Sequence, residues 1–348
     1  MIYFLLLAGA LWLIGRAMRT PRRARLLMIA LLYVVFLVFM VVLPDGHPVR
    51  AAMGGSLAEW LVLGGLVGAV IVYRGGLRRL RARAETQAAP VEVPREGFGS
   101  AELERYARHI ILREIGGPGQ KKLKQSRVLV VGAGGLGSPA LLYLAGAGVG
   151  TIGVIDGDVV ENANLQRQVI HADDRIGMPK VFSAEAGMRA LNPYVAVRPY
   201  HRALTEEIAA ELVAEYDVVL DGTDNFETRY LVNRVCVAAG VPLISGALTQ
   251  WEGQISLFHP AGGSPCYECI FPEAPAPGLA PSCAEAGVLG PLPGVIGSMM
   301  AVEAVKLLAG AGEGLAGRML IYDALYGETR GIGLKRRADC PVCGGVSE

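Results

Sequence analysis

The sequence predicts an α/β fold, a doubly wound and mostly parallel sheet, preceded by transmembrane helices. From residue 127 onward, short β-branched and apolar runs alternate with helical segments, and a glycine-rich loop follows the first run. Over 348 residues the mean hydropathy is +0.39 and 19% of residues are charged, with the apolar excess in the first ninety. This composition excludes a disordered chain and a nucleic-acid-coating protein, so we expect no nucleic-acid partner.

Residues 1–83 are predicted to form a transmembrane region with helices at about 1–15, 26–43 and 56–73. The middle segment is uncharged over eighteen residues, which gives about 27 Å of helix, close to the hydrocarbon thickness of a bilayer. The third contains one acid, Glu59, which we expect at the membrane interface; a functional acid inside the membrane is the alternative. Buried core helices are the alternative for the whole region, although no polar face recurs at helical period.

Two groups of five arginines flank these segments and predict the topology. They are Arg16, Arg19, Arg22, Arg23 and Arg25, then Arg74, Arg78, Arg79, Arg81 and Arg83. The loop between the second and third segments is nearly neutral, so the positive-inside rule puts the N-terminus outside and everything after residue 74 in the cytoplasm. We therefore expect a multi-pass protein of the inner, cytoplasmic membrane. If residues 1–15 only lie at the interface, two spans remain and the N-terminus is inside.

Residues 84–99, rich in Ala, Pro, Glu and Gly, are predicted to be a linker, and residues 100–348 a folded domain. The charge divides likewise: residues 1–99 hold 12 Lys and Arg against 5 Asp and Glu, and the remainder 21 against 27. Within the domain we expect strands at 127–131, 151–155, 195–199, 217–220 and 242–245. We expect helices at 138–147, 181–191, 205–214, 226–239 and 298–309.

A glycine-rich loop between the first strand and helix predicts a Rossmann-like nucleotide site. Its glycines are Gly132, Gly134, Gly135 and Gly137. Glycines let backbone amides approach phosphates, and the following helix N-terminus favours an anion. Asp156 ends the next strand, 19 residues after Gly137, where an acid can accept hydrogen bonds from ribose hydroxyls. Taken alone, this pattern suggests a nicotinamide dehydrogenase.

Charged residues beyond the loop change that interpretation. Arg167 and Lys180 follow Asp156, and a triphosphate needs such cations whereas a nicotinamide enzyme does not. Asp224 follows the strand at 217–220, where a carboxylate can hold Mg²⁺. The sequence therefore predicts an Mg-ATP site.

Four motifs together resemble the MoeB/ThiF/HesA adenylyltransferases, prokaryotic relatives of the ubiquitin-activating enzyme. They are Arg105-Tyr-Ala-Arg108-His-Ile, Val131-Gly-Ala-Gly-Gly-Leu-Gly-Ser138, Asn164-Leu-Gln-Arg-Gln168 and Asp221-Gly-Thr-Asp-Asn225. The resemblance covers about residues 100–346 and leaves the membrane region aside. It implies that Asp156 binds ribose, that Asp224 holds Mg²⁺, and that Asn164, Arg167 and Lys180 bind the phosphates of ATP. It also implies a homodimer in which Arg108 reaches the partner's active site.

The resemblance implies a reaction as well. The family joins AMP to the C-terminal glycine of a small ubiquitin-like sulfur carrier and releases pyrophosphate. A carboxylate is already an anionic nucleophile, so such a site needs cations and positioning but no general base. A MoaD-like carrier of molybdopterin synthesis is favoured, and a ThiS-like carrier of thiazole synthesis is the alternative. A nicotinamide-dependent oxidoreductase and an inactive carrier-binding scaffold are the competitors from other classes.

Two Cys-x-x-Cys pairs predict a structural zinc site. Cys266 and Cys269 form one pair, and Cys340 and Cys343 the other. Four thiolates suit tetrahedral Zn²⁺ and leave no open position for catalysis, so the ion would hold the C-terminus against the body of the domain. The family's zinc-binding members carry the same arrangement.

Two further cysteines stand apart from these pairs. Cys283 follows a proline-rich stretch that suits a mobile crossover loop. In some relatives a cysteine in this loop takes part in sulfur transfer, and in others it is dispensable. Cys236, within an apolar helix, is predicted to be a core residue. Because no rhodanese-like domain follows, we expect the sulfur donor to be a separate protein.

Overall fold

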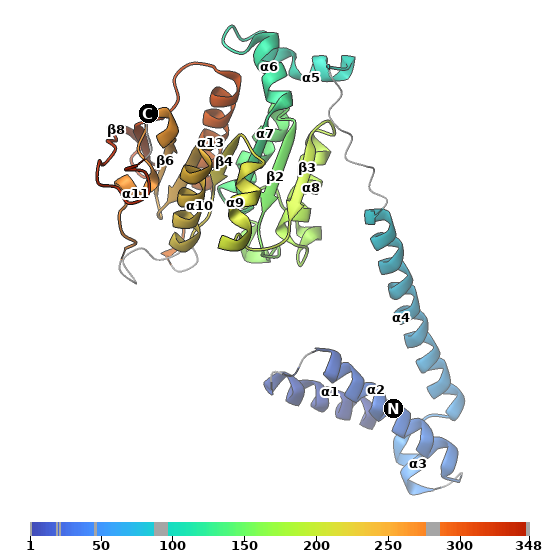
Figure 1. The fold of residues 1–348 in the computed structure, drawn as a ribbon. Helices are drawn as coiled ribbons and strands as arrows, with labels where there is room; N and C mark the ends of the chain where they lie inside the picture. The colour runs from blue at the N-terminus through green and yellow to red at the C-terminus, as the bar shows by residue number, and fades with distance from the viewer. Residues whose placement is uncertain are drawn as a thin grey trace. The chain divides into compact units, whose positions relative to one another are not determined.

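The computed structural model describes residues 2–18, 20, 22–44, 47–86, 97–275 and 286–345. The chain divides into two compact units, Met1–Pro90 and Val91–Glu348 (Figure 1). The first unit is helical and the second contains the sheet.

The N-terminal unit consists of helices joined by short loops. Its helices are α1 (Ile2–Ala17), α2 (Arg22–Val42), α3 (Pro48–Met53) and α4 (Leu57–Thr86). Helices α1, α2 and α4 each cover one of the three apolar segments expected from the sequence, apart from a residue at one end. Helix α4 continues without a break through the arginines that follow the third segment, and so reaches three residues into the range expected as a linker.

Aromatic side chains form the centre of this unit. Trp60 is fully buried, and its indole N–H donates to the Gly54 carbonyl over 3.0 Å. The ring of Phe4 meets the Trp60 ring edge-on at 5.3 Å between centroids, and Phe36 lies 5.6 Å from the same ring. These ring contacts bring α1, α2 and α4 together in an apolar cluster, and the Tyr33 hydroxyl of α2 also donates to the Trp60 carbonyl of α4.

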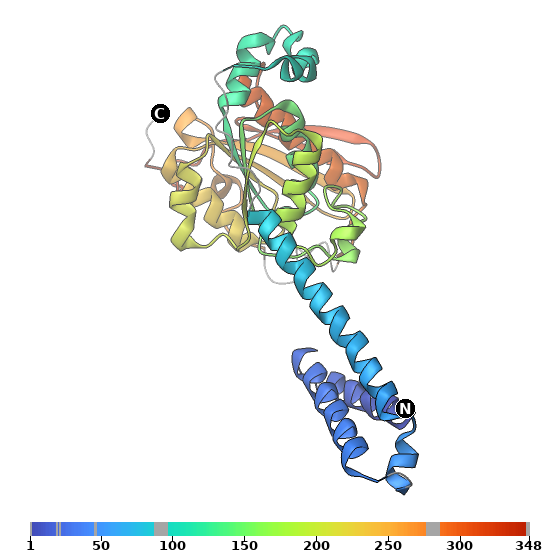
Figure 2. The same ribbon diagram turned by 90° about the vertical axis from the view of Figure 1, so that its right-hand side faces the viewer.

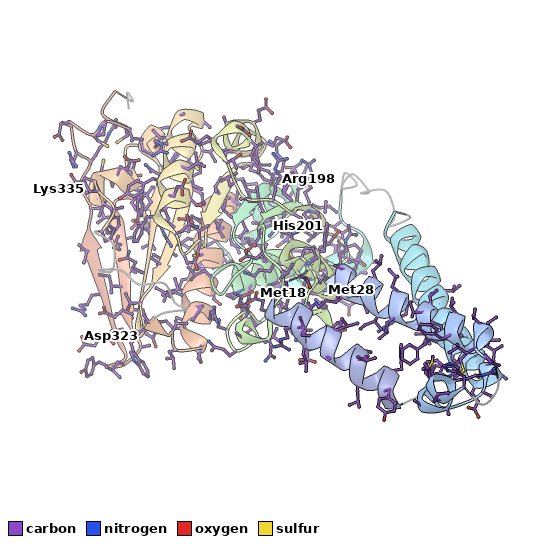
Figure 3. The ribbon with its side chains drawn as sticks, turned by 90° about the horizontal axis from the view of Figure 1, so that it is seen from below. Met18, Met28, Arg198, His201, Asp323 and Lys335 are labelled. Atoms are coloured by element: carbon purple, nitrogen blue, oxygen red, sulfur yellow. The ribbon has the colours of Figure 1, made fainter. Side chains whose placement is uncertain are left out.

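The outer surface of the N-terminal unit is apolar. Ala24–Val42 and Leu57–Gly76 are long and apolar enough to cross a membrane, and only 11% and 6% of the residues in their most apolar windows are buried. Figure 3 shows side chains projecting outward along the helices of this unit; Met28 of α2 is 40% exposed, and Met18, just after α1, is 71% exposed. A water-soluble protein rarely exposes so much continuous apolar surface, so these two helices are candidate spans.

Glu59, the acid in the third apolar segment, caps the start of α4. The Ser56 backbone N–H donates to the Glu59 carboxylate over 3.0 Å, and the Glu59 N–H donates to the Ser56 hydroxyl over 3.3 Å. This reciprocal pair satisfies amides that have no partner within the helix. The carboxylate is thus occupied at a helix end.

The second unit is built on an eight-stranded sheet. The strands are β1 (Arg127–Val131), β2 (Thr151–Ile155), β3 (Ala196–Tyr200), β4 (Val218–Asp221), β5 (Leu243–Leu248), β6 (Glu252–Phe258), β7 (Arg318–Asp323) and β8 (Glu328–Gly333). Their order is β3-β2-β1-β4-β5-β6-β7-β8; neighbours pair in parallel from β3 to β5 and antiparallel from β5 to β8. The five strands that the sequence predicted correspond to β1–β5, which pair in parallel. Strands β6, β7 and β8 extend the sheet with antiparallel pairing.

Helices cover both faces of this sheet (Figure 2). The helices of this unit are α5 (Ser100–Ile110), α6 (Gly116–Gln125), α7 (Gly137–Ala147), α8 (Lys180–Leu191), α9 (Glu206–Ala214), α10 (Phe226–Ala239), α11 (Tyr267–Ile270) and α13 (Pro291–Ala309). Alternate residues of β1 supply the two cores: Val128 and Val130 pack with α7, α8 and α13, whereas Leu129 and Val131 pack with α9 and α10. This is the doubly wound arrangement.

Helix α13 resembles a membrane span in length and composition, yet it belongs to this core. Half of its apolar window is buried. Ile296 and Met300 are fully buried in the cluster that also contains Leu136 and Leu141 of the α7 side. Its hydrophobicity is explained by packing against the sheet.

Candidate active site

A cleft of about 630 Å³ opens at the carboxyl ends of the parallel strands. Its walls come from the residues that follow β1, β2, β3 and β4, and from β5 and β6. Strands β1 and β4 are neighbours, and the chain winds away from them in opposite directions. Open α/β sheets bind ligands at this switch point, outside the carboxyl ends of the strands.

The glycine loop forms one wall of the cleft. Gly132, Gly134 and Gly135 line it. Gly132 has φ +93°, a conformation that favours glycine. A Cβ at Gly137 would lie 1.9 Å from the Gly132 carbonyl oxygen, so Gly137 allows the tight turn although it does not line the cleft. Helix α7 begins there, and its N-terminal amides favour an anion at the loop.

Asp156 lies at the end of β2 and orders the neighbouring backbone. One carboxylate oxygen accepts from the Ala133 N–H and the other from the Asp158 N–H, each over 2.8 Å. Asp156 also lines the cleft. A carboxylate oxygen has two lone pairs, so these bonds leave acceptors for a ribose hydroxyl.

Two of the predicted phosphate-binding residues line the cleft, and the third supports them. Lys180, at the start of α8, is buried except for 6% and pairs with Asp158 over 2.8 Å. Arg167 lines the cleft and donates to the Ala163 carbonyl over 3.2 Å. Asn164 is not among the lining residues; its carbonyl accepts from the Arg167 N–H over 3.1 Å. Asn164 therefore shapes the turn that presents Arg167.

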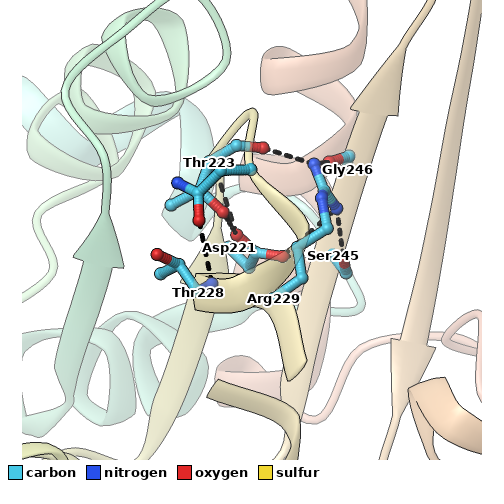
Figure 4. A network of polar contacts seen from close by, with 7 residues as sticks. Asp221, Thr223, Thr228, Arg229, Ser245 and Gly246 are labelled. Atoms are coloured by element: carbon cyan, nitrogen blue, oxygen red, sulfur yellow. Dashed lines mark hydrogen bonds and ion pairs between the residues drawn. The ribbon is translucent and has the colours of Figure 1, made fainter. Parts of the chain in front are cut away.

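A buried ion pair holds the loop that follows β4 (Figure 4). Asp221 and Arg229 are 1% and 5% exposed and lie 3.2 Å apart. Asp221 also accepts from the Thr223 N–H and hydroxyl, and Arg229 donates to the Thr223 and Gly246 carbonyls. Each charge is thereby compensated and hydrogen-bonded, the condition under which a buried pair persists. The pair fixes the loop between β4 and α10 against β5.

Asp224 lies on that loop in the cleft wall and is exposed. Within the described ranges its carboxylate has no hydrogen bond or ion pair, whereas Asp221 three residues earlier is fully engaged. The next residue, Asn225, caps α10 by accepting from the Thr228 N–H over 2.9 Å. Asp224 is thus the acid of this loop that remains available to a Mg²⁺ ion.

The structure does not bring Arg108 to the cleft of its own chain. Arg108 is exposed on α5 and is not among the lining residues. Cys283 lies outside the described residues.

The cleft wall also contains residues that the sequence analysis did not single out. Gln168 is 4% exposed, and its side-chain oxygen has no partner in the part of the chain that the structure describes. Arg202 follows β3, and Arg330 on β8 pairs with Glu252 over 3.5 Å. Arg202 follows a predicted strand, and this position could have marked it as a cleft residue. Arg330 lies on β8, a strand that the sequence analysis did not predict.

The four paired cysteines converge away from the cleft. Their sulfur atoms all lie within 4.8 Å of one another, with separations of 3.8, 3.6 and 3.4 Å for Cys266–Cys269, Cys266–Cys340 and Cys269–Cys343. A disulfide would need about 2.05 Å, whereas the edge of a tetrahedral zinc–thiolate site is about 3.8 Å for a Zn–S bond near 2.3 Å. The spacing therefore fits a bound metal ion.

The cysteine cluster joins α11 to the C-terminal segment. Cys266 precedes α11 and Cys340 follows β8, 74 residues later. Four thiolates held this close together would repel one another, so the ionised cluster needs a cation between them. Burial raises the pKa of Cys236, which packs in the core as the sequence predicts.

Comparison with known proteins agrees with this geometry. A profile of the ThiF family matches residues 106–342. The SAMP-activating enzyme E1 of Haloferax volcanii is 53% identical over 70% of this chain and 90% of its own length. The sulfur carrier protein adenylyltransferase of Thermus thermophilus is 51% identical over 70% of this chain and 91% of its own length.

A solved structure of the microcin C7 biosynthetic enzyme MccB, in complex with N-formylated MccA, has a similar fold. Its TM-score is 0.60 at 26% identity, over 69% of this chain and 75% of that one. The family profile covers most of the second unit, and both curated relatives are matched over nearly their whole length. This chain therefore belongs to the ThiF family and is an enzyme of its adenylyltransferase class.

Proposed function

We propose that this enzyme transfers AMP from ATP to the C-terminal glycine of a small ubiquitin-like sulfur carrier, MoaD-like rather than ThiS-like, and releases pyrophosphate. One observation carries the proposal: Arg167, Lys180 and Asp224, the last without a partner among the described residues, line one cleft with the glycine loop. A nicotinamide enzyme has no use for that charged set. The similarity to the sulfur carrier protein adenylyltransferase of Thermus thermophilus supports a sulfur carrier as the acceptor.

The cleft residues divide the work of this reaction. Asp156 would hold the ribose, and Gly134, Arg167 and Lys180 would bind the phosphates. Asp224 would hold Mg²⁺, which neutralises phosphate charge when bound. The acceptor carboxylate is already ionised, so the protein must align it with the α-phosphate and stabilise the charge that develops.

ATP–pyrophosphate exchange tests this function directly. Purified enzyme is assayed with a MoaD-like carrier, a ThiS-like carrier, and the MoaD-like carrier truncated by its terminal glycine. We expect exchange with the first and none with the truncated form. Exchange with the ThiS-like carrier alone would reassign the pathway. Tight NADH binding without ATP binding, measured by calorimetry, would reject adenylylation.

We further propose that the enzyme is a homodimer in which Arg108 completes the partner's site, with the sulfur donor a separate protein. The exposure of Arg108 on α5, outside the cleft of its own chain, supports this arrangement. Arg108→Ala and Asp224→Asn are each expected to be inactive, and mixing them should restore activity in hybrid dimers. No recovery on mixing would contradict a role across the interface.

A further inference from the structure

A buried histidine stands directly behind the glycine loop. His171 is 8% exposed and does not line the cleft. Its Nε2 lies 2.9 Å from the Ala133 carbonyl oxygen, and its Nδ1 lies 2.9 Å from the Ser183 hydroxyl. The ring therefore connects the glycine loop to α8, the helix that begins with Lys180.

These two contacts define the protonation of the ring. A carbonyl oxygen only accepts hydrogen bonds, so Nε2 carries the hydrogen and donates to Ala133. Nδ1 then accepts from the Ser183 hydroxyl. Burial lowers the pKa of His171, which keeps the imidazole neutral at pH 7.

The peptide planes on both sides of Ala133 are held from outside the loop. The Asp156 carboxylate accepts a hydrogen bond from the Ala133 N–H over 2.8 Å, and His171 donates one to the Ala133 carbonyl. Ala133 lies between Gly132 and Gly134, which have no Cβ and give these planes wide rotational freedom. Without the two side chains, little in the loop itself would prevent the peptide from flipping.

The orientation of the Ala133 carbonyl determines that of the next amide. In a trans peptide the C=O and the following N–H point to opposite sides. Because the Ala133 oxygen faces His171, the Gly134 N–H faces away from it. Gly134 lines the cleft, and its N–H has no hydrogen-bond partner within the described ranges.

We propose that His171 is a positioning residue for the nucleotide: it fixes the Ala133–Gly134 peptide so that the Gly134 N–H donates to a phosphate of ATP. A flipped peptide would instead turn a carbonyl oxygen toward the phosphate and repel it. The proposal rests on the ATP site of the proposed function. It concerns phosphate affinity and leaves the binding of adenosine unaffected.

Two variants matched in length separate the hydrogen bond from the packing. His171→Gln keeps an N–H donor, and His171→Met does not. Calorimetry on the detergent-solubilised full chain measures the affinity for Mg-ATP and for adenosine. We expect His171→Met to weaken Mg-ATP binding about tenfold, in line with the loss of a polar contact to a charged group. His171→Gln should stay within about threefold of wild type, and adenosine affinity should be unchanged in both variants.

Three results would overturn the proposal. Equal Mg-ATP affinity of the Met and Gln variants would show that the donor is unimportant. Equal losses of ATP and adenosine affinity would indicate a general structural role. Wild-type protein that binds no Mg-ATP would reject the proposed function together with the positioning role.

A measurement on wild-type protein covers the case in which His171→Met does not fold. Hydrogen exchange followed by mass spectrometry reports on the peptide that contains Gly134. Mg-ATP should slow exchange there, and adenosine should not. Absence of protection by Mg-ATP, in protein that calorimetry shows to bind it, would overturn the contact.

Discussion

Asp221 and Asp224 lie on one loop, but their surroundings give them different roles. Asp221 is buried and shares its charge with Arg229 over 3.2 Å. Asp224 is exposed in the cleft wall without a partner among the described residues. The first carboxylate stabilises the loop, and the second is available to a ligand. The sequence shows the same residue type twice, and only packing distinguishes them.

Asp224→Asn should abolish pyrophosphate exchange while leaving the fold intact. The amide keeps the shape but loses the charge that would hold Mg²⁺, and at about 1.4 kcal/mol per tenfold a loss of several kcal/mol exceeds a thousandfold. The matched control is Glu227→Gln, an exposed acid on α10 that does not line the cleft. Near-normal exchange by Asp224→Asn would mean that another group holds the metal.

Arg229→Met should destabilise the second unit. Removing one partner of a buried pair leaves an uncompensated charge, which costs about 3–5 kcal/mol. Arg234→Met on the same helix is the control, because Arg234 meets Glu206 at the surface over 3.6 Å and such pairs contribute about 0–1 kcal/mol. Denaturant unfolding, followed by far-UV circular dichroism, measures the free energy of unfolding of both variants. Equal stability of the two variants would contradict a structural role for the buried pair.

At the scale of elements, the cysteine cluster connects segments that are far apart in sequence. Helix α11 has four residues and the chain after β8 has no strand or helix in the described part. Tyr267 anchors α11 in the core beside α10, and the four thiols join α11 to the segment after β8. A metal ion at this cluster would contribute folding energy rather than chemistry.

We therefore expect about one Zn²⁺ per chain, as two Cys-x-x-Cys pairs bind one ion. Cys340→Ser should lose the metal and lower the thermal midpoint. The turnover of the protein that remains folded should change little. Cys236→Ala should retain zinc, because Cys236 packs in the core outside the cluster. Elemental analysis and thermal unfolding measure these effects. Purified protein with reduced cysteines and no zinc would reject the assignment.

Elements with a strong local pattern were predictable from the sequence, and those without one were not. Strands β1 and β2 are almost wholly buried, so each is a continuous apolar run that the sequence displays. Strand β8 is exposed at all six positions and contains two glycines, so it offers no apolar pattern. Its register is imposed by pairing with β7.

The candidate site divides in the same way. The glycine loop, Asp156 and Lys180 follow strands or begin helices, where the sequence marks functional positions. The contribution of His171 runs through the Ala133 carbonyl, and no spacing rule detects a contact between a side chain and a distant backbone group. The carbonyl of Asn164, a motif residue, accepts from the Arg167 N–H, and this backbone contact too is not visible in the sequence pattern.

At the scale of the whole molecule, an enzyme of the ThiF family is joined to a helical unit with an apolar exterior. The arginines after Leu57–Gly76 and the need of the active site for ATP favour the cytoplasmic side for the second unit. Reporter fusions after residue 90 test this topology. We expect cytoplasmic fluorescent-protein signal and no alkaline phosphatase activity, and the reverse would overturn it. A fusion at the N-terminus distinguishes three spans from two.

Helix α13 has a consequence for the way in which the chain is made. A ribosome that inserts α2 and α4 into a membrane would later deliver Pro291–Ala309, a third segment with the length and hydropathy of a span. The elements on which α13 packs, namely α6, α7, β5 and β6, all precede it in the sequence. They have therefore already been synthesised when α13 emerges, and domains fold as units during synthesis. If α2 and α4 enter a membrane during synthesis, this order of elements would let α13 pack onto its own partly folded domain as it emerges, in competition with the lipid bilayer.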